Sequence, residues 1–232
     1  MFYLIGLGLD LGNLSREARE IVSSAKEVYL ENYTVDFPYN IKELGDELSR
    51  ELTPADRENV ESFKVLEGAE KEDVVLLVYG SPLTATTHIT LIQEAKMKSI
   101  NYRILFNASV FDAVAETGLQ LYKFGKIASM PGFEANSYLD IVKENEKMGA
   151  HTLILVDIGM NFKSAVERLG KDLETKGLVL GKIVACSSLG TSESKIAYGK
   201  IEILKDLDFK NPFCFVVPGK LHFVEEEFLE KI

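Results

Sequence analysis

The sequence is short of several residue types, and each shortage excludes a class of protein. It contains two cysteines and no tryptophan. Two cysteines do not make the disulfide framework of a small secreted domain. Cys186 and Cys214 each lie in an apolar segment, without a second cysteine or a histidine at the spacing of metal ligands. We therefore expect buried structural thiols rather than a redox pair or a metal site.

Basic residues are the scarcer charge. Lysine and arginine total 26 against 36 aspartates and glutamates, which gives a net charge of -10. A polyanion needs a basic surface on its protein partner. The charge therefore argues against unaided binding to nucleic acid or to an anionic membrane.

Long apolar runs are absent as well. No run approaches the roughly 20 residues of a membrane-spanning helix, and the N-terminal segment lacks the basic flank and long apolar region of a signal peptide. We expect a soluble cytoplasmic protein. The 46% hydrophobic and 27% charged residues in a chain of 232 are typical of globular proteins, with one large domain or two small ones.

Residues 74–88, VVLLVYGSPLTATTH, carry the most pronounced pattern in the chain. The unbroken apolar run predicts a strand buried on both faces, as in a parallel sheet, and Gly80 and Pro82 end it. Threonines 84, 86 and 87 are predicted to cap a helix that buries Ile89, Ile92 and Ala95. Open α/β sheets bind ligands where a strand ends and a helix begins, so this stretch is the first candidate site.

A glycine turn follows the first predicted strand, at residues 2–5. Gly6 and Gly8 precede a helical pattern, but Leu11 stands where the third glycine of a dinucleotide-binding G-x-G-x-x-G motif would fall. The turn therefore does not match that motif. Two interpretations stay open, a close approach of backbone to a ligand or a plain tight turn.

Strand-like segments alternate with helical ones up to about residue 106, which predicts an α/β domain. Further on, strands at residues 126–130, 152–158, 183–186, 196–204 and 213–217 follow one another with less helix between them. This favours a mixed sheet and an α+β domain. We predict an α/β protein of two domains, residues 1–110 with a mostly parallel sheet and residues 111–232 with a mixed sheet.

The chain shows no familiar catalytic motif. It has no hydrolase elbow, Walker phosphate loop or paired-histidine zinc motif. His88, His151 and His222 are isolated from one another and are expected to be structural or surface groups, while Asp157 either serves a site or caps a loop. We name no catalytic residue and expect no metal. A pocket without an evident catalyst suits a transfer reaction that relies on positioning and a reactive cofactor.

Four strings taken together resemble the diphthine synthases, which are methyltransferases of the tetrapyrrole methylase fold. They are GLGL at residues 6–9, GSPLTATTH at 80–88, NASVFDAVAETGLQLYKFGK at 107–126 and VPGKLHFVEEEFL at 217–229. They occur in the family's order across nearly the whole chain. The combination of the last three strings is specific, although each alone is weak.

The resemblance implies a homodimer that binds S-adenosylmethionine in the cleft between its domains and releases S-adenosylhomocysteine. The implied acceptor is the amino nitrogen of a 3-amino-3-carboxypropyl group on one histidine of translation elongation factor 2, and we favour the trimethylated product. The cofactor contacts carried over by motif, some of them through backbone atoms, are Leu9, Ser81, Thr84, Ser109, Val110, Val156, Leu189 and Phe213.

One position departs from the family. The usual Gly-Asp-Pro-Leu is here Gly80-Ser81-Pro82-Leu83, so a carboxylate is replaced by a hydroxyl. Part of the charge-assisted hydrogen bonding to the cofactor's cationic groups is then missing, unless Asp10 or Asp157 compensates.

Two alternatives stay open. One is another methyltransferase of the same fold, acting on a corrin precursor or on ribosomal RNA. The acidic charge disfavours RNA, and the strings PGKLH and GLQLYKFG disfavour a corrin. The other is a module that binds S-adenosylmethionine without turnover, which Ser81 makes worth considering.

Overall fold

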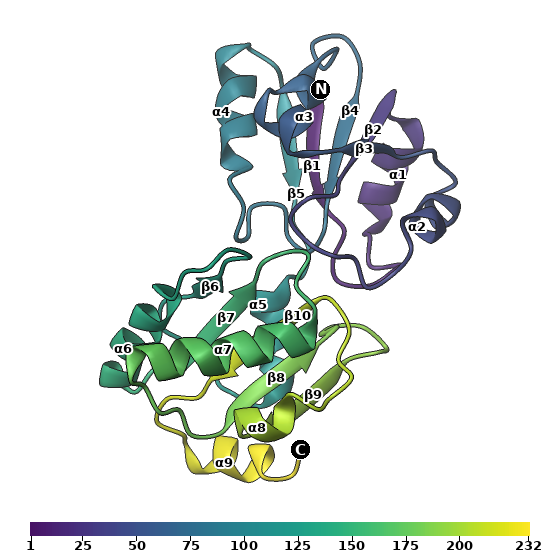
Figure 1. Ribbon diagram of the computed structural model, residues 1–232. Helices are drawn as coiled ribbons and strands as arrows, with labels where there is room; N and C mark the ends of the chain where they lie inside the picture. Colours follow the sequence, from purple (N-terminus) through teal and green to yellow (C-terminus); the bar gives the residue numbers. More distant parts are fainter. The chain divides into compact units, whose positions relative to one another are not determined.

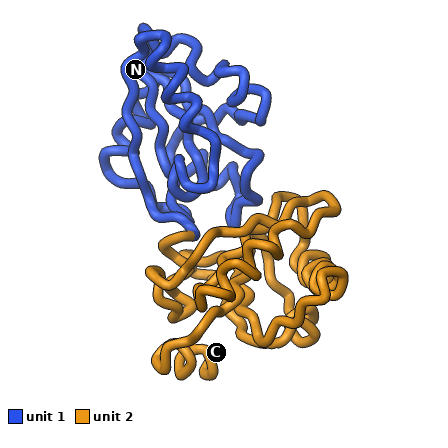
Figure 2. Tube along the Cα trace, turned by 90° about the vertical axis from the view of Figure 1, so that its left-hand side faces the viewer, with its two compact units in different colours: residues 1–110 blue, residues 111–232 orange.

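A computed structural model describes all of residues 1–232. The chain divides into two compact units, Met1–Val110 and Phe111–Ile232, which are coloured blue and orange in Figure 2. Each unit has a five-stranded sheet of its own. The units are therefore described one at a time.

The first unit is built on a fully parallel sheet. Its strands are ordered β3-β2-β4-β1-β5, which places β4 and β1 near the centre. All five residues of β4 are buried, as the unbroken apolar run predicts for a strand covered on both faces. The strands are β1 (Phe2–Gly6), β2 (Glu27–Glu31), β3 (Thr53–Ala55), β4 (Val74–Val78) and β5 (Tyr102–Leu105).

Helices cover both faces of this sheet (Figure 1). On one face α1 (Arg16–Ser24) and α2 (Ile41–Leu48) share a core cluster with Ile5 of β1. On the other face α3 (Arg57–Glu61), the 3-10 turn η1 (Lys64–Leu66) and α4 (Ile89–Met97) pack with Leu4. Burial on both faces explains why the central strands are continuous apolar runs. The predicted parallel α/β architecture is confirmed.

The second unit has a mixed sheet, as the sequence predicts. Its order is β6-β7-β10-β8-β9, with β6 and β7 parallel and the other pairs antiparallel. The strand that comes last in the sequence, β10, therefore lies at the centre. The strands are β6 (Ala128–Met130), β7 (Thr152–Val156), β8 (Ile183–Ser187), β9 (Lys195–Gly199) and β10 (Phe213–Val217).

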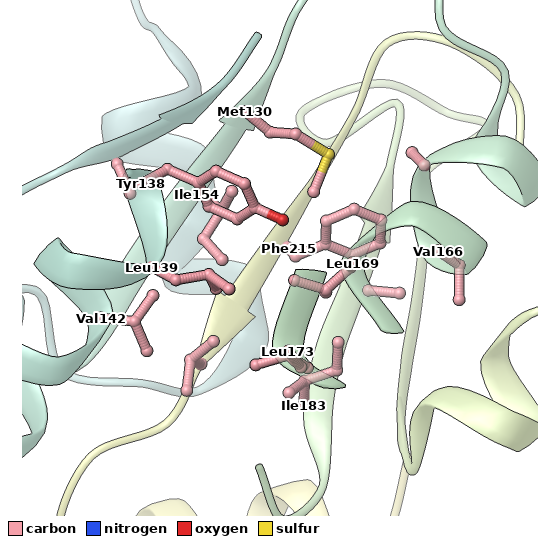
Figure 3. Packing of buried hydrophobic residues seen from close by; sticks show 14 of the residues in the cluster. Met130, Tyr138, Leu139, Val142, Ile154, Val166, Leu169, Leu173, Ile183 and Phe215 are labelled. Atoms are coloured by element: carbon pink, nitrogen blue, oxygen red, sulfur yellow. The ribbon is translucent and has the colours of Figure 1, made fainter. Parts of the chain in front are cut away.

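The core of the second unit lies beneath α6 (Tyr138–Met148) and α7 (Phe162–Lys176) (Figure 3). Phe215 of β10 is fully buried there. Burial of a large apolar side chain contributes about 2–3 kcal/mol, so this face stabilises the unit strongly. The remaining helices are α5 (Val110–Ala113), the 3-10 turns η2 (Val114–Thr117) and η3 (Leu121–Lys123), α8 (Ile201–Leu204) and α9 (Phe223–Leu229).

Three local predictions are wrong. The helix after the candidate stretch begins at Ile89, its N-cap is His88 without a side-chain cap, and Ile89 is 49% exposed. The segment predicted as one strand at residues 196–204 splits into β9 and the helix α8. The strand β5 is an edge strand of which Leu105 alone is buried, and Phe106 beyond it is 68% exposed.

Both cysteines are buried and free, as expected. No helix is both long enough and apolar enough to cross a membrane.

Candidate functional site

The connections of the first unit change direction at the C-terminal ends of β1 and β4. Strands β1 and β4 are neighbours, but the helix after β1 packs on one face and the helix after β4 on the other. The two loops therefore leave the sheet in opposite directions. In open α/β sheets such a switch point is where ligands bind. The topology places the candidate stretch at this point.

The glycines of both loops are required by close packing. A Cβ atom on Gly6 would lie 2.5 Å from the carbonyl oxygen of Gly80, and one on Gly8 would lie 2.7 Å from Cβ of Asn13. Gly8 also has a φ of +75°, which disfavours any other residue. Gly8 and Gly80 exchange backbone hydrogen bonds of 3.1 and 2.9 Å. The glycine turn is thus joined to the stretch after β4.

Both backbone polar groups of Leu9, beside this junction, are hydrogen-bonded. Its N–H donates to Oδ1 of Asn13 at 3.3 Å, and its carbonyl accepts from the hydroxyl of Tyr79 at 3.0 Å. Burial, and to a smaller extent the negative charge of Asp10, raises the pKa of Tyr39. Burial also raises the pKa of Tyr79, whose ring packs against that of Tyr39. The Tyr79 hydroxyl therefore stays protonated and can donate its hydrogen bond to the Leu9 carbonyl.

The end of β5 is tied to the same turn. The side-chain amide of Asn107 donates to the carbonyl oxygens of Gly6 and Asn13, at 3.2 and 3.1 Å. A Cβ atom on Gly80 would lie 3.7 Å from Cα of Ser109, so the two segments pass close to one another. Ser109 is 5% exposed and directly precedes α5, and Val110 is half-buried at its first position. Three of the strings that carry the family resemblance therefore meet here.

Ser81 and Thr84 lie on one turn after β4. Ser81 is 9% exposed, and its carbonyl accepts from the N–H of Thr84 at 3.1 Å. The threonine hydroxyls that follow do not cap the helix, because Thr86 donates to the carbonyl of Pro82 at 3.0 Å. That bond holds the turn instead.

The three predicted contacts in the second unit lie at one edge of its sheet. Val156 ends β7, Phe213 begins β10, and Leu189 follows β8 by two residues. Because β10 runs antiparallel to both neighbours, the end of β7, the start of β10 and the end of β8 meet at that edge. Leu189 is buried, and the ring of Phe213 packs edge-on against Phe162.

Two carboxylates hold the loops at this edge. Asp157 accepts from the backbone N–H groups of Gly132 and Ile158, at 2.9 and 3.0 Å, so it caps loops as one of the two interpretations expects. Glu116 accepts from the N–H of Gly190 at 2.7 Å and from the hydroxyl of Ser194 at 2.6 Å. Glu116 thereby holds the loop that contains Leu189.

A buried polar network joins the third resembling string, at residues 107–126, to the fourth, at residues 217–229. Glu225 of α9 is fully buried and accepts from Nε2 of His151 at 3.1 Å, from the N–H of Gln120 at 2.9 Å and from Lys123. The N–H of Gly219 donates to Nδ1 of His151 at 2.9 Å, which fixes the imidazole tautomer. Sequence reasoning missed this network, because His151 and Glu225 are 74 residues apart.

The network shifts the pKa of both titrating partners. Burial alone would raise the pKa of Glu225, but hydrogen bonds from the N–H of His222, from Lys123, from the N–H of Gln120 and from His151 outweigh it and lower the pKa to about 2. Burial lowers the pKa of His151, against the opposing attraction of Glu225. His151 is therefore neutral, and Glu225 beside it is ionised.

The first unit thus offers buried backbone and hydroxyl groups rather than a set of catalytic side chains. No group of three histidine, cysteine, aspartate or glutamate side chains is arranged to hold a metal ion. Glycines without side chains at a strand end let a ligand approach the backbone closely. The arrangement suits the binding and orientation of a ligand that brings its own reactivity.

Comparisons with known proteins agree on one family. The family model described as tetrapyrrole (corrin/porphyrin) methylases matches residues 1–205. The chain is 36% identical over 249 residues to a diphthine synthase of Methanococcus aeolicus, which covers 99% of this chain and 97% of that protein. A crystal structure of a diphthine synthase superposes with a TM-score of 0.91 at 33% identity, over 100% of this chain and 95% of the other. A putative diphthine synthase from Entamoeba histolytica gives 0.88 at 28%, over 99% and 97%.

Proposed function

Because this chain belongs to the tetrapyrrole methylase family, and to the diphthine synthases within it, we propose that it methylates translation elongation factor 2 in diphthamide biosynthesis. The class of enzyme follows from the family: the chain is an S-adenosylmethionine-dependent methyltransferase. The match over the full length of both proteins is the observation that carries the proposal. The acceptor is the amino group of a 3-amino-3-carboxypropyl-histidine, and the product is the trimethylated diphthine.

The first unit fits a cofactor with a polar nucleoside and an amino acid moiety. Its glycine turn brings backbone groups to the C-terminal ends of β1 and β4, where Gly8 bonds to Gly80, and the hydroxyl residues Ser81 and Thr84 lie on the turn that follows Gly80. We assign cofactor contacts to Leu9, Ser81, Thr84, Ser109 and Val110 in this unit, and to Val156, Leu189 and Phe213 in the second. When bound, S-adenosylmethionine supplies an activated methyl group, so the protein needs no nucleophile of its own.

The protein must orient an uncharged amine toward the methyl group and let its proton leave. Neither Asp157 nor His88 suits that second task. Both oxygens of Asp157 accept backbone N–H groups, and Nε2 of His88 is shielded from solvent. We therefore assign no general base, and water is the expected proton acceptor.

The direct experiment is incubation with labelled S-adenosylmethionine and elongation factor 2 that carries the unmethylated side chain. Mass spectrometry is expected to show stepwise additions of one methyl group on a single histidine peptide, up to the trimethylated form. An unchanged peptide, with binding of the cofactor intact, would overturn the assignment of the acceptor.

Ser81 supports one alternative from a different class, a module that binds S-adenosylmethionine without turnover. The hydroxyl makes weaker hydrogen bonds to the cofactor's cationic groups than the carboxylate expected from the family resemblance would make. Calorimetric titration with S-adenosylhomocysteine tests what the two share, because both the enzyme and the binding module require a complex. The methylation experiment then separates them, because the enzyme alone modifies the histidine peptide. Absence of binding at high micromolar ligand would refute both.

A further inference from the structure

The turn that follows β4 contains a strained residue. Gly80 and Ala85 both have positive φ values, +70° and +55°. Glycine adopts this left-handed conformation freely, whereas for a residue with a Cβ atom it costs on the order of 1–2 kcal/mol. Ala85 lies directly after Thr84, so the strain belongs to the turn that carries the two hydroxyl residues of the candidate site. Other contacts must therefore hold this turn in place.

The carbonyl oxygen of Pro82 receives two of those contacts. The hydroxyl of Thr86 donates to it at 3.0 Å, and Nδ1 of His88 lies 3.1 Å from it. Both donors come from the chain after Ala85, and the acceptor comes from the chain before it. The two hydrogen bonds therefore close the chain across the strained residue.

The protonation of the His88 ring follows from its partner. A carbonyl oxygen only accepts, so Nδ1 carries the hydrogen and Nε2 has a lone pair. Nε2 is buried and has no hydrogen-bond partner, and the residue is 1% exposed. The ring therefore acts through Nδ1, and its other nitrogen does not reach a substrate.

We propose that His88 is a positioning residue for cofactor binding, which fixes the 81–84 turn through Nδ1 and the Pro82 carbonyl. The proposal rests on the proposed function for the roles of Ser81 and Thr84. Loss of the Nδ1 donor releases Ala85 from its strained conformation and moves both hydroxyls. The consequence is weaker binding of the cofactor with an unchanged rate of methyl transfer once the cofactor saturates.

Two substitutions of His88 separate its two nitrogens. His88→Asn keeps an N–H donor at the position of Nδ1, while His88→Gln places its amide at the position of Nε2. We expect His88→Gln to raise the Kd for S-adenosylhomocysteine and the KM for S-adenosylmethionine about 10-fold. His88→Asn is expected to stay within about threefold of the wild type, because it restores the bond that matters.

Thr86→Val tests the same carbonyl without touching the buried histidine. It removes one of the two donors and is expected to raise the same constants about fivefold. Thr90→Val is the matched control, because the Thr90 hydroxyl donates to the carbonyl of Thr87 at the same distance, 3.0 Å, outside the turn. Its constants are expected to equal those of the wild type.

Two outcomes would overturn the proposal. The first is a loss of kcat in both His88 variants with unchanged cofactor binding, which would mean that Nε2 acts in the chemistry. The second is a nitrogen NMR spectrum of the wild type in which Nε2, rather than Nδ1, carries the hydrogen. The spectrum does not depend on any ligand. If the wild type binds no S-adenosylhomocysteine, the proposed function fails while the tautomer remains testable.

Discussion

Ser81 is the position at which the family resemblance leads us to expect an aspartate, and it lies at the candidate site. Its side chain is nearly buried beside the junction of the β1 and β4 loops. We expect Ser81→Asp to tighten binding of S-adenosylmethionine about 10-fold, because a carboxylate makes charge-assisted hydrogen bonds to cationic groups. Calorimetric titration measures the effect, and Ser81→Asn controls for size. Weaker binding would show that another acid already fills this role.

Asp10 is better placed than Asp157 to be that acid. Its Oδ1 accepts from the N–H of Leu11 at 2.8 Å, beside the glycine turn of the first unit. Asp157 uses both of its oxygens for backbone N–H groups. Weaker binding in Ser81→Asp thus points first to Asp10.

Glu225 makes stability depend on pH. Its pKa falls from 4.5 to about 2 on folding, so it stabilises the folded state above its unfolded pKa. That contribution, about 3 kcal/mol, is lost as the pH falls from 4.5 toward 2. The lowered pKa of His151 acts in the same direction, because the unfolded chain binds a proton first as the pH falls below 6.5. Urea unfolding across this range measures the loss.

Glu225→Gln is the informative variant for that experiment. The amide cannot keep the ion pair with Lys123, so we expect a loss of about 3 kcal/mol at neutral pH and a flatter dependence below pH 4.5. Glu226→Gln, on the exposed side of α9, serves as the control. An unchanged acid dependence in Glu225→Gln would assign the effect to other carboxylates.

At the scale of elements, the glycine turn is the most sensitive part of the first unit. Gly6→Ala would place a Cβ atom 2.5 Å from the backbone oxygen of Gly80, so the junction must open. We expect loss of detectable cofactor binding and a destabilisation of about 3 kcal/mol. Gly12 lies in the same loop with open space around it and φ of +84°, so Gly12→Ala is expected to cost only about 1 kcal/mol. Equal effects of the two variants would contradict this account.

The same elements show which parts of the fold and of the candidate site the sequence predicts. Apolar runs predict the buried strands β4 and β10, because burial on both faces leaves a local pattern. The sequence does not reveal that Thr86 and His88 hold a carbonyl rather than cap α4, since that depends on the strained Ala85. Nor does it reveal the partners of Glu225, which lie on distant segments. The His222-x-x-Glu225 spacing at the start of α9 is the available signal, because it forms a capping box.

At the scale of the whole molecule, the homodimer that the family resemblance implies predicts a molecular mass twice that of one chain. The chain weighs 25.9 kDa, so light scattering on a size-exclusion column is expected to give twice that value. The value should not change on dilution through the micromolar range if the dimer is obligate. A mass of one chain at all concentrations would refute the expectation.

The position of β10 has a consequence for the order in which the chain can fold during synthesis. All five strands of the first unit lie within its first 105 residues, so a ribosome can release that sheet complete. The second sheet lacks its central strand until residues 213–217 emerge. Until then the backbone groups with which β7 and β8 pair to β10 are unpaired. We therefore expect nascent chains stalled before this strand to bind chaperones more than the completed chain does.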